Sequence, residues 1–250
     1  ERVGAELRLI LDCPHAYPAL RDMAAACILD VLFPEITAMR GCRQNRFHHL
    51  DVFEHSLAAI QACEALLADP EPIFSELTQA IQADLGNWRL PWLKLAILLH
   101  DAGKPSTRAL HPRTQQATFY GHDLLGAQLA HNAAYRLKLS RVETEYLVAL
   151  IRRHLHTGAI LTPQATPKAR MRLLRRLGPN VIPAVLLCLA DTEATQGPAS
   201  TPRFRHNTLE QGLRLIRDSL GASKAVLDAP ALLSGHDLIA LGMRPGPKLG

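Results

Sequence analysis

Hydrophobic residues recur at intervals of three and four along most of the chain, a spacing that places them on one face of an α-helix. Leu57, Ile60 and Leu67 form such a stripe behind Asp51, and Glu54 three residues after Asp51 completes the pattern of a capping box. No stretch shows a convincing strand pattern, an internal repeat or a glycine-rich phosphate loop. The pattern therefore predicts an all-α fold.

Proline, glycine and polar runs divide this pattern into separate helices. We expect short helices within residues 1–46 and longer ones near 51–67, 72–86, 93–99, 121–137, 142–156, 168–177, 180–194 and 207–220. Residues 105–120 and 194–206 are predicted to be a loop and a linker. Segments 93–99 and 181–194 are apolar nearly all round, so both helices should be buried in the core.

Composition narrows the class of protein only modestly. The chain has 250 residues, enough for one large or two small domains, and no apolar run approaches the ~20 residues of a membrane span. Its five cysteines are scattered without a CxxC pair, which indicates neither a disulfide framework nor a cysteine zinc site and favours a reducing cytoplasm. There is no initiator Met and no signal-like segment, so we expect a piece of a longer protein. The net charge of +5 leans mildly towards polyanionic partners.

The chemistry centres on residues 93–104, LKLAILLHDAGK, where a buried helix runs into His100 and Asp101 before Gly103 and Pro105 stop it. Unpaired polar groups are costly away from water, and a divalent metal ion is one compensation, because imidazole and carboxylate suit zinc, iron, manganese or nickel. The alternative is a helix C-cap, in which His100 meets the helix dipole and Asp101 pairs with Lys104.

Other potential ligands lie near helix ends or within buried faces: His55, His122, His154 and Asp191. Asp191 is a lone ionisable group in an apolar stretch with no lysine or arginine nearby, so it needs a partner. Together these residues would satisfy two ions bridged by Asp101, about 3.5–4 Å apart, a pair that clamps a phosphoryl oxygen and activates water. Lys104 could neutralise the phosphate. Each histidine could instead be a packed core residue, and His48 and His49 are expected to be ordinary surface histidines.

Basic residues occur in three places. The helix at 168–177 and the end of the preceding helix are either a solvated face or a phosphate-contacting strip, formed by Arg152, Arg153, Lys168, Arg172, Arg175 and Arg176. In the loop at 105–120, Arg108 and Arg113 could stabilise charge that develops on a phosphate.

The order His, His-Asp, His, His, Asp resembles the HD phosphohydrolase superfamily, whose fold is all-helical, and HDAGK is similar to its His-Asp-x-Gly-Lys motif. The resemblance implies that the core metal ligands are His55, His100, Asp101 and Asp191. His122 and His154 match the additional histidines of two-metal members. The implied cofactor is one or two divalent ions, with manganese, nickel, cobalt, iron, magnesium and zinc not distinguished.

A narrower resemblance covers nearly the whole chain. HHLDVFEHSL, GHDLLGAQLA and the final GHDLIALGMRPGPKLG look like the HD-containing C-terminal half of bacterial tRNA nucleotidyltransferases and poly(A) polymerase-like proteins. ERVGAELRLIL and LFPEI look like the helical neck before that domain. The resemblance implies a neck at 1–46, an HD domain at 47–195 and a truncated helical arm at 196–250. The mixed α/β head of that family, with its Gly-Ser motif and paired aspartates, has no counterpart in these residues.

Two functions follow from the resemblance. The first is a metal-dependent phosphohydrolase, possibly acting on RNA ends or 2′,3′-cyclic phosphates, in which Asp101 and Lys104 carry the catalysis. The second is an RNA-binding arm of a nucleotidyltransferase with a vestigial HD site. The expected partners are a phosphate ester or nucleotide and tRNA or another RNA, with no membrane. A plain helical scaffold is the third possibility.

Overall fold

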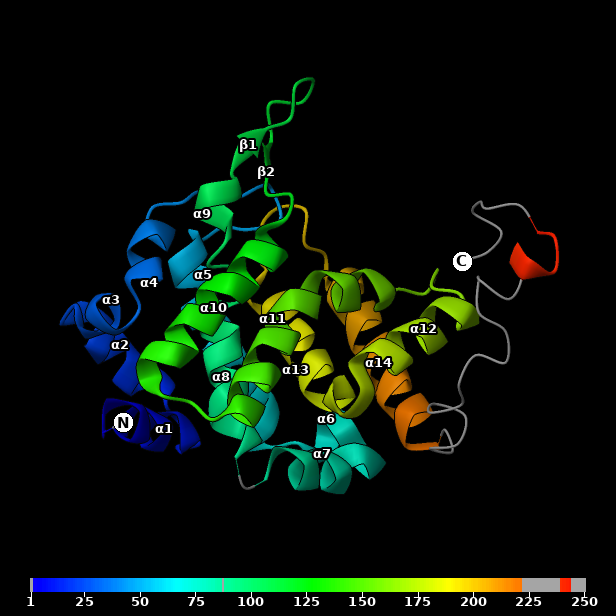
Figure 1. The fold of residues 1–250 in the computed structure, drawn as a ribbon, viewed down its shortest axis with the longest axis horizontal. Coiled ribbons are helices and arrows are strands. Elements are labelled where there is room, and N and C mark those ends of the chain that lie inside the picture. Colours follow the sequence, from blue (N-terminus) through cyan, green and yellow to red (C-terminus); the bar gives the residue numbers. More distant parts are fainter. Residues whose placement is uncertain (1, 87, 222–238, 244–250) are drawn as a thin grey trace.

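The computed structural model describes residues 2–86, 88–221 and 239–243, and its helical content confirms the all-α prediction (Figure 1). The N-terminal quarter forms α1 (Arg2–Asp12), α2 (Tyr17–Ala25), α3 (Ile28–Leu32), α4 (Pro34–Met39) and the start of α5 (Val52–Ala68). Then follow α6 (Glu71–Phe74), the 3-10 turn η1 (Ser75–Leu77), α7 (Thr78–Leu85), α8 (Arg89–Leu99) and α9 (Lys104–Thr107). The second half contains α10 (His122–Leu137), α11 (Arg141–Ile160), α12 (Pro167–Leu177), the turn η2 (Gly178–Asn180), α13 (Val181–Ala194) and α14 (Pro202–Gly221).

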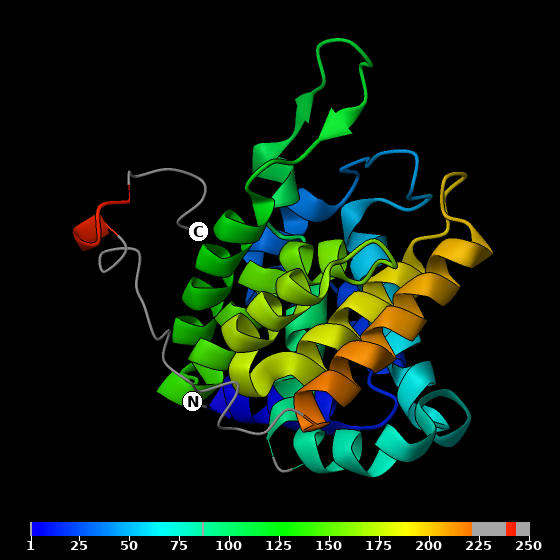
Figure 2. The same ribbon diagram turned by 90° about the vertical axis from the view of Figure 1, so that its right-hand side faces the viewer.

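Helices α8 and α13 form the centre of the bundle, as their nearly continuous apolar sequences predict. α8 packs against α1, α5 and α11, whereas α13 packs against α5, α11 and α14 (Figures 1 and 2). Burying helices that are apolar on every side requires neighbours all round them. The two central helices therefore bring their C-terminal ends, and the polar residues placed there, into the interior.

The N-terminal helices are tied to this bundle by a buried ion pair. Lys94 of α8, 1% exposed, donates to Glu64 of α5 at 2.8 Å. The backbone N–H of Ala16, between α1 and α2, donates to the same carboxylate at 2.7 Å. Two buried charges that pair with each other and also hydrogen-bond to the backbone offset the cost of removing them from water. The first helices are thus packed on the bundle rather than separate from it.

The segment expected to be a plain loop at 105–120 is partly ordered. It contains α9 and a short antiparallel hairpin of β1 (Ala109–Leu110) and β2 (Ala117–Thr118), in which Ala109 pairs with Thr118. The expectation that the chain has no strand is wrong here, because two-residue strands are too short to produce an alternating pattern. The hairpin projects from one end of the bundle in Figures 1 and 2.

Several predicted helix bounds are wrong, and the helix expected from residue 93 already begins at Arg89. The helix expected at 72–86 is broken into α6, η1 and α7, and Ser75 at the break has φ of 46°. α11 continues to Ile160, so His154 lies inside this helix rather than at its end. α14 begins at Pro202 instead of residue 207, because Pro202 suits a first helical position and the Thr201 hydroxyl accepts the N–H of Phe204.

Half of the capping box predicted for α5 is formed: the Asp51 carboxylate accepts the N–H of Glu54 at 2.8 Å, but no reciprocal bond from the Asp51 N–H to the Glu54 carboxylate is found in the described residues. The Glu54 carboxylate itself pairs with Arg21 of α2. The five cysteines are free thiols.

One stretch of the described residues, Pro167–Ala194, is long and apolar enough to cross a membrane by length and composition. However, 72% of its most apolar window is buried inside the fold. This apolar window is therefore a buried core segment of the fold. Within the predicted arm at 196–250, residues 222–238 and 244–250 lie outside the described residues, and they include most of the final GHDLIALGMRPGPKLG.

Candidate metal centre

Five helices deliver the predicted ligands to one interior site. His55 lies in the first turn of α5, His122 is the first residue of α10, and His154 lies within α11. His100 caps the C-terminus of α8 with Asp101 directly after it, and Asp191 lies in the last turn of α13. The structure therefore brings all six side chains together, although they span 136 residues of sequence.

Asp101 lies between two pairs of histidines. Its Oδ2 is 3.1 Å from Nε2 of His100 and 4.0 Å from Nε2 of His55. Its Oδ1 is 3.2 Å from Nε2 of His122 and 3.9 Å from Nε2 of His154. Each carboxylate oxygen thus faces its own pair of imidazoles. A carboxylate with one oxygen towards each of two imidazole pairs could bridge two neighbouring cations.

Three of the histidines are held in the orientation that leaves Nε2 available. Nδ1 of His100, His122 and His154 each lies 2.6–2.8 Å from the backbone carbonyl three residues earlier. Because a carbonyl only accepts, each Nδ1 must carry a proton, which leaves Nε2 as the atom that can bind a metal once it is deprotonated. An imidazole that donates its other N–H to a carbonyl is typical of a metal ligand.

The polar atoms of the centre lack ordinary hydrogen-bond partners, which tests whether a metal fits. Among the described residues, no hydrogen bond of acceptable geometry reaches Nδ1 of His55, Nε2 of His100 or either oxygen of Asp101, and all are buried. Apart from the ion pair between Lys104 and Oδ2 of Asp101, these buried atoms have no satisfying hydrogen bond, and their concentration at one point indicates a missing partner. Nitrogen and carboxylate donors suit a divalent ion. The side chains of this centre therefore suit a divalent metal ion.

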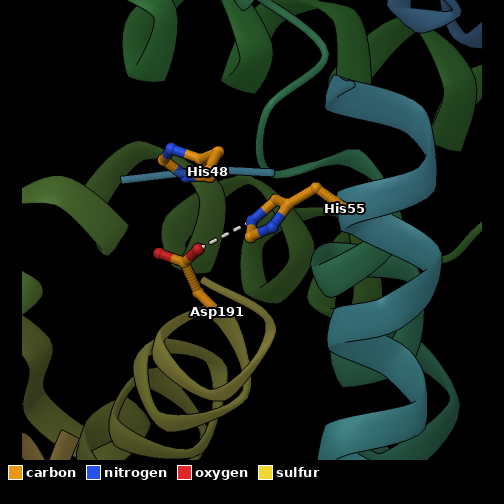
Figure 3. Close-up of side chains that lie close together, drawn as sticks. All are labelled: His48, His55 and Asp191. Carbon is orange, nitrogen blue, oxygen red and sulfur yellow. Dashed lines mark hydrogen bonds and ion pairs between the residues drawn. The ribbon is translucent and has the colours of Figure 1, made fainter. Parts of the chain in front are cut away.

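Figure 3 shows the part of the centre formed by His55 and Asp191. Nε2 of His55 lies 2.9 Å from Oδ1 of Asp191, and the same oxygen is 3.8 Å from Nε2 of His100. The partner that Asp191 needs is therefore histidine, not lysine or arginine. The Asp191 side chain is also 32% exposed, so it reaches the edge of the core rather than its interior.

His48 joins the same group and was missed by the sequence reasoning. We expected it to be a surface residue, but it is half-buried and its ring meets that of His55 edge-on, with centroids 4.8 Å apart. His49 is exposed as expected. The sequence feature that could have indicated this role is its spacing, because His48 precedes His55 by only seven residues and can therefore reach the start of α5.

Lys104 reaches into the centre from α9. Its ammonium lies 2.6 Å from Oδ2 of Asp101 and donates to the Gln44 side chain at 2.6 Å. This contact combines the two alternatives drawn from the sequence, since the lysine pairs with Asp101 while the histidines gather around the same carboxylate. Its predicted role as a phosphate ligand stays a prediction.

A cavity of about 330 Å³ opens above these residues. Its walls include Asp101, Lys104 and His154, together with Phe119 and Tyr120 after strand β2. The hairpin therefore forms one side of the entrance.

None of the eight basic residues predicted to bind phosphate or RNA lines this cavity in the described part of the chain. Arg108 precedes strand β1 and Arg113 lies between β1 and β2, and both are exposed. Arg152 and Arg153 lie on α11, and Lys168, Arg172, Arg175 and Arg176 are exposed on α12. Arg170 of the same helix is instead buried, 3.6 Å from Asp218 of α14.

The electrostatics of the centre separate its groups. Burial opposes charge on Asp101, but His100 and Lys104 outweigh it and hold the pKa of Asp101 well below its ordinary value. Burial likewise opposes charge on His100, yet Asp101 and Asp191 raise the pKa of His100 to about 10. Burial and the neighbouring His100 lower the pKa of His154 to about 4. At neutral pH, Asp101 is thus ionised and His154 neutral, as binding of a cation requires, whereas His100 carries an additional proton.

Comparison with known proteins agrees with this geometry. The family described as HD domain matches residues 52–195, and a family described as the probable RNA and SrmB-binding site of polymerase A matches residues 1–40. The first match contains His55, His100, His122, His154 and both aspartates.

Similar proteins include the A-adding tRNA nucleotidyltransferase of Deinococcus radiodurans, 35% identical over all of this chain and 52% of the relative. The CC-adding tRNA nucleotidyltransferase of Thermus thermophilus is 31% identical over all of the chain and 50% of the relative. The multifunctional CCA protein of Pasteurella multocida is 28% identical over 79% of the chain and 43% of the relative. The chain spans about half the length of these relatives, and its HD region corresponds to their C-terminal half. On the match over residues 52–195, the chain belongs to the HD domain family.

Proposed function

We propose that this chain is a metal-dependent phosphohydrolase domain that acts on phosphomonoesters or phosphodiesters. RNA ends and 2′,3′-cyclic phosphates are the proposed substrates, by analogy with the tRNA-related names of its relatives. The observation that carries the proposal is Asp101, with one carboxylate oxygen facing each of two imidazole pairs. A bound pair of divalent ions would polarise a phosphoryl oxygen and activate a water molecule for attack on phosphorus.

The chain's own residues have distinct tasks in this proposal. His55, His100, His122, His154 and Asp191 would hold the ions together with Asp101. Lys104 lies at the floor of the cavity, where its charge can orient a phosphate and stabilise the charge that develops on it. Arg108 and Arg113 are exposed on the hairpin segment, whose second strand lines the cavity, and are proposed to contact the remainder of the substrate. The proposal includes a cytoplasmic location and the residue ranges 1–46, 47–195 and 196–250 for neck, HD domain and arm.

Hydrolysis of a generic phosphodiester should require a divalent ion and His100. We expect metal-stripped protein to be inactive, and manganese, cobalt or nickel to restore activity more fully than magnesium. His100→Ala should lose at least about 100-fold in kcat/KM, because metal ligands supply several kcal/mol of charge stabilisation. The matched control is His156→Ala, which changes an exposed histidine two residues after His154 on α11. Activity unchanged by stripping or by His100→Ala would refute the proposal.

Metal binding should release a proton from His100. Its pKa of about 10 means that the metal-free protein holds this proton at pH 7, whereas the lowered pKa values of Asp101 and His154 leave those ligands deprotonated. Affinity should therefore rise with pH between about 6 and 9. Calorimetry at pH 7 in buffers of different ionisation enthalpy should detect roughly one released proton per chain. A heat independent of buffer would contradict this expectation.

A second candidate function is RNA binding by the basic surface. Exposed cationic residues of α12 follow one another closely, and the guanidinium of Arg176 lies 3.5 Å from His156 of α11, which joins the two helices into one surface. A helix that presents several cations can contact successive phosphates. The match of residues 1–40 to an RNA-binding description supports the same function.

Salt dependence should distinguish this function from hydrolysis. We expect tRNA binding to weaken as salt rises, and the double variant Arg172→Ala/Arg176→Ala to lower the slope of log K against log salt by up to about 2. Lys138→Ala, on the turn after α10, serves as a control for net charge. Binding without a salt slope would remove this second function, while leaving the hydrolase proposal untouched.

A further inference from the structure

A loop histidine outside the HD match enters the metal centre. His48 precedes residue 52, where the family match begins, and lies on the segment between α4 and α5. Its ligand atom lies within 4.8 Å of those of His55 and Asp191, and it lines the same cavity as Asp101 and Lys104. Two ligands each about 2.0–2.2 Å from one ion lie at most about 4.4 Å apart. A shift of a few tenths of an ångström would therefore place all three around one cation.

Asn45 sets the orientation of this histidine. Its Oδ1 accepts the backbone N–H of Phe47 at 3.1 Å and lies 3.1 Å from Nδ1 of His48. An amide oxygen can only accept, so Nδ1 of His48 carries the proton and Nε2 presents its lone pair. The ligand histidines His100, His122 and His154 show the same pattern, with a carbonyl in place of the Asn45 amide. Fixing the tautomer in this way is characteristic of residues that support metal ligands.

The loop that carries His48 is held against the end of α13. The N–H groups of Gly197 and Ala199 donate to the carbonyls of Phe47 and Arg46 at 2.7 and 3.2 Å. A Cβ on Gly197 would lie 2.6 Å from the Arg46 carbonyl oxygen, so only glycine allows this approach. Because Asp191 lies in the last turn of α13, the same contacts fix the distance between His48 and Asp191. Figure 3 shows the three side chains converging from the loop, α5 and α13.

We propose that His48 is a further metal ligand on the His55–Asp191 side of the centre, with Asn45 as its positioning residue. The inference rests on the proposed metal centre and deepens it. With His48, three imidazoles from His48, His55 and His100 surround this position beside two carboxylates. Magnesium prefers oxygen ligands, whereas manganese, iron, cobalt, nickel and zinc accept imidazole. This side of the centre therefore selects a transition metal over magnesium.

Metal titration of matched variants tests the inference without using activity. We expect His48→Ala to weaken the binding of one cobalt or manganese ion by at least about tenfold and to leave the second unchanged, since second-sphere changes alone cost 10–100-fold. Asn45→Ala should weaken the same ion by a smaller factor. His49→Ala, the exposed neighbour, should match the wild type.

Two further measurements make the outcome decisive. X-ray absorption of the cobalt-loaded protein should count fewer imidazole nitrogens per metal in His48→Gln than in His49→Ala. Thermal unfolding of the metal-free proteins should be the same for both variants, which excludes a folding defect. Equal affinities and equal nitrogen counts would overturn the role of His48 alone. A wild-type chain that binds no divalent ion would overturn the metal centre itself, so the two failures are distinguishable.

Discussion

Asp101→Asn is expected to remove both metal ions and to lower kcat/KM for phosphodiester hydrolysis by roughly 10³-fold or more. The reason is geometric, because the two oxygens of this carboxylate face separate histidine pairs, His55 with His100 and His122 with His154. An amide keeps the shape but supplies one weaker oxygen donor and one NH₂ group, which cannot bind a cation. No other side chain in the described centre contacts both pairs at these distances.

The measurement is elemental analysis of protein equilibrated with manganese, followed by steady-state hydrolysis. Asp69→Asn, at the C-terminal cap of α5, is a matched control because it is exposed and lies on the same helix as His55. Asp191→Asn should affect the His55 side of the centre more than the His122 side, since Asp191 contacts His55 and His100. Retention of two ions by Asp101→Asn would show that Asp101 does not bridge them.

Gly103→Ala should destabilise the protein by roughly 1–3 kcal/mol, at the upper end of that range, and disturb the centre at the same time. A Cβ at this position would overlap the carbonyl oxygen of His122 and lie 2.8 Å from the N–H nitrogen of Gly126. Both atoms belong to the backbone of α10, so they cannot move aside as a side chain would. Any relief must shift His100 and Asp101 away from His122, which lengthens the distances that hold the centre together.

Thermal unfolding should show a fall in Tm of about 2–4 °C per kcal/mol for a chain of this size. Metal affinity should fall in the same variant. Gly158→Ala is the matched control: it lies in α11, a Cβ there meets nothing within 4 Å, and alanine favours a helix by about 1 kcal/mol. Equal Tm values for Gly103→Ala and the wild type would refute the close backbone contact.

The sequence correctly predicted a structural role for Gly103, but the physical reason for the glycine differs from the predicted one. We expected this glycine to stop the helix that ends in His100 and Asp101. Its φ is −78°, which any residue adopts, so the backbone angle does not require glycine. The requirement comes from α10, whose approach within contact distance of this turn has no local signature. The glycine of the HDAGK segment therefore serves packing between two ligand-bearing segments.

Local sequence accounted well for elements whose cause is local. Apolar residues on all sides of 93–99 and 181–194 predicted the two buried helices, and Asp51 predicted the start of α5. The family order of histidines and aspartates identified the HD domain before any contact was known. The hairpin at 109–118 was missed because its strands contain two residues each, and the register is set by pairing rather than by pattern.

The sequence by itself determined that this chain is helical, which two helices form its core, and that six potential metal ligands occur in the order of the HD family. Helical periodicity and residue type are local properties, so one chain suffices to read them. Only the tertiary structure decided that Asp191 meets His55, that Asp101 divides its oxygens between two histidine pairs, and that the loop at Asn45 brings His48 to the same place. Those contacts join segments as much as 136 residues apart, and they depend on how helices pack. Packing is fixed by the shapes of whole surfaces, which no spacing along the chain records.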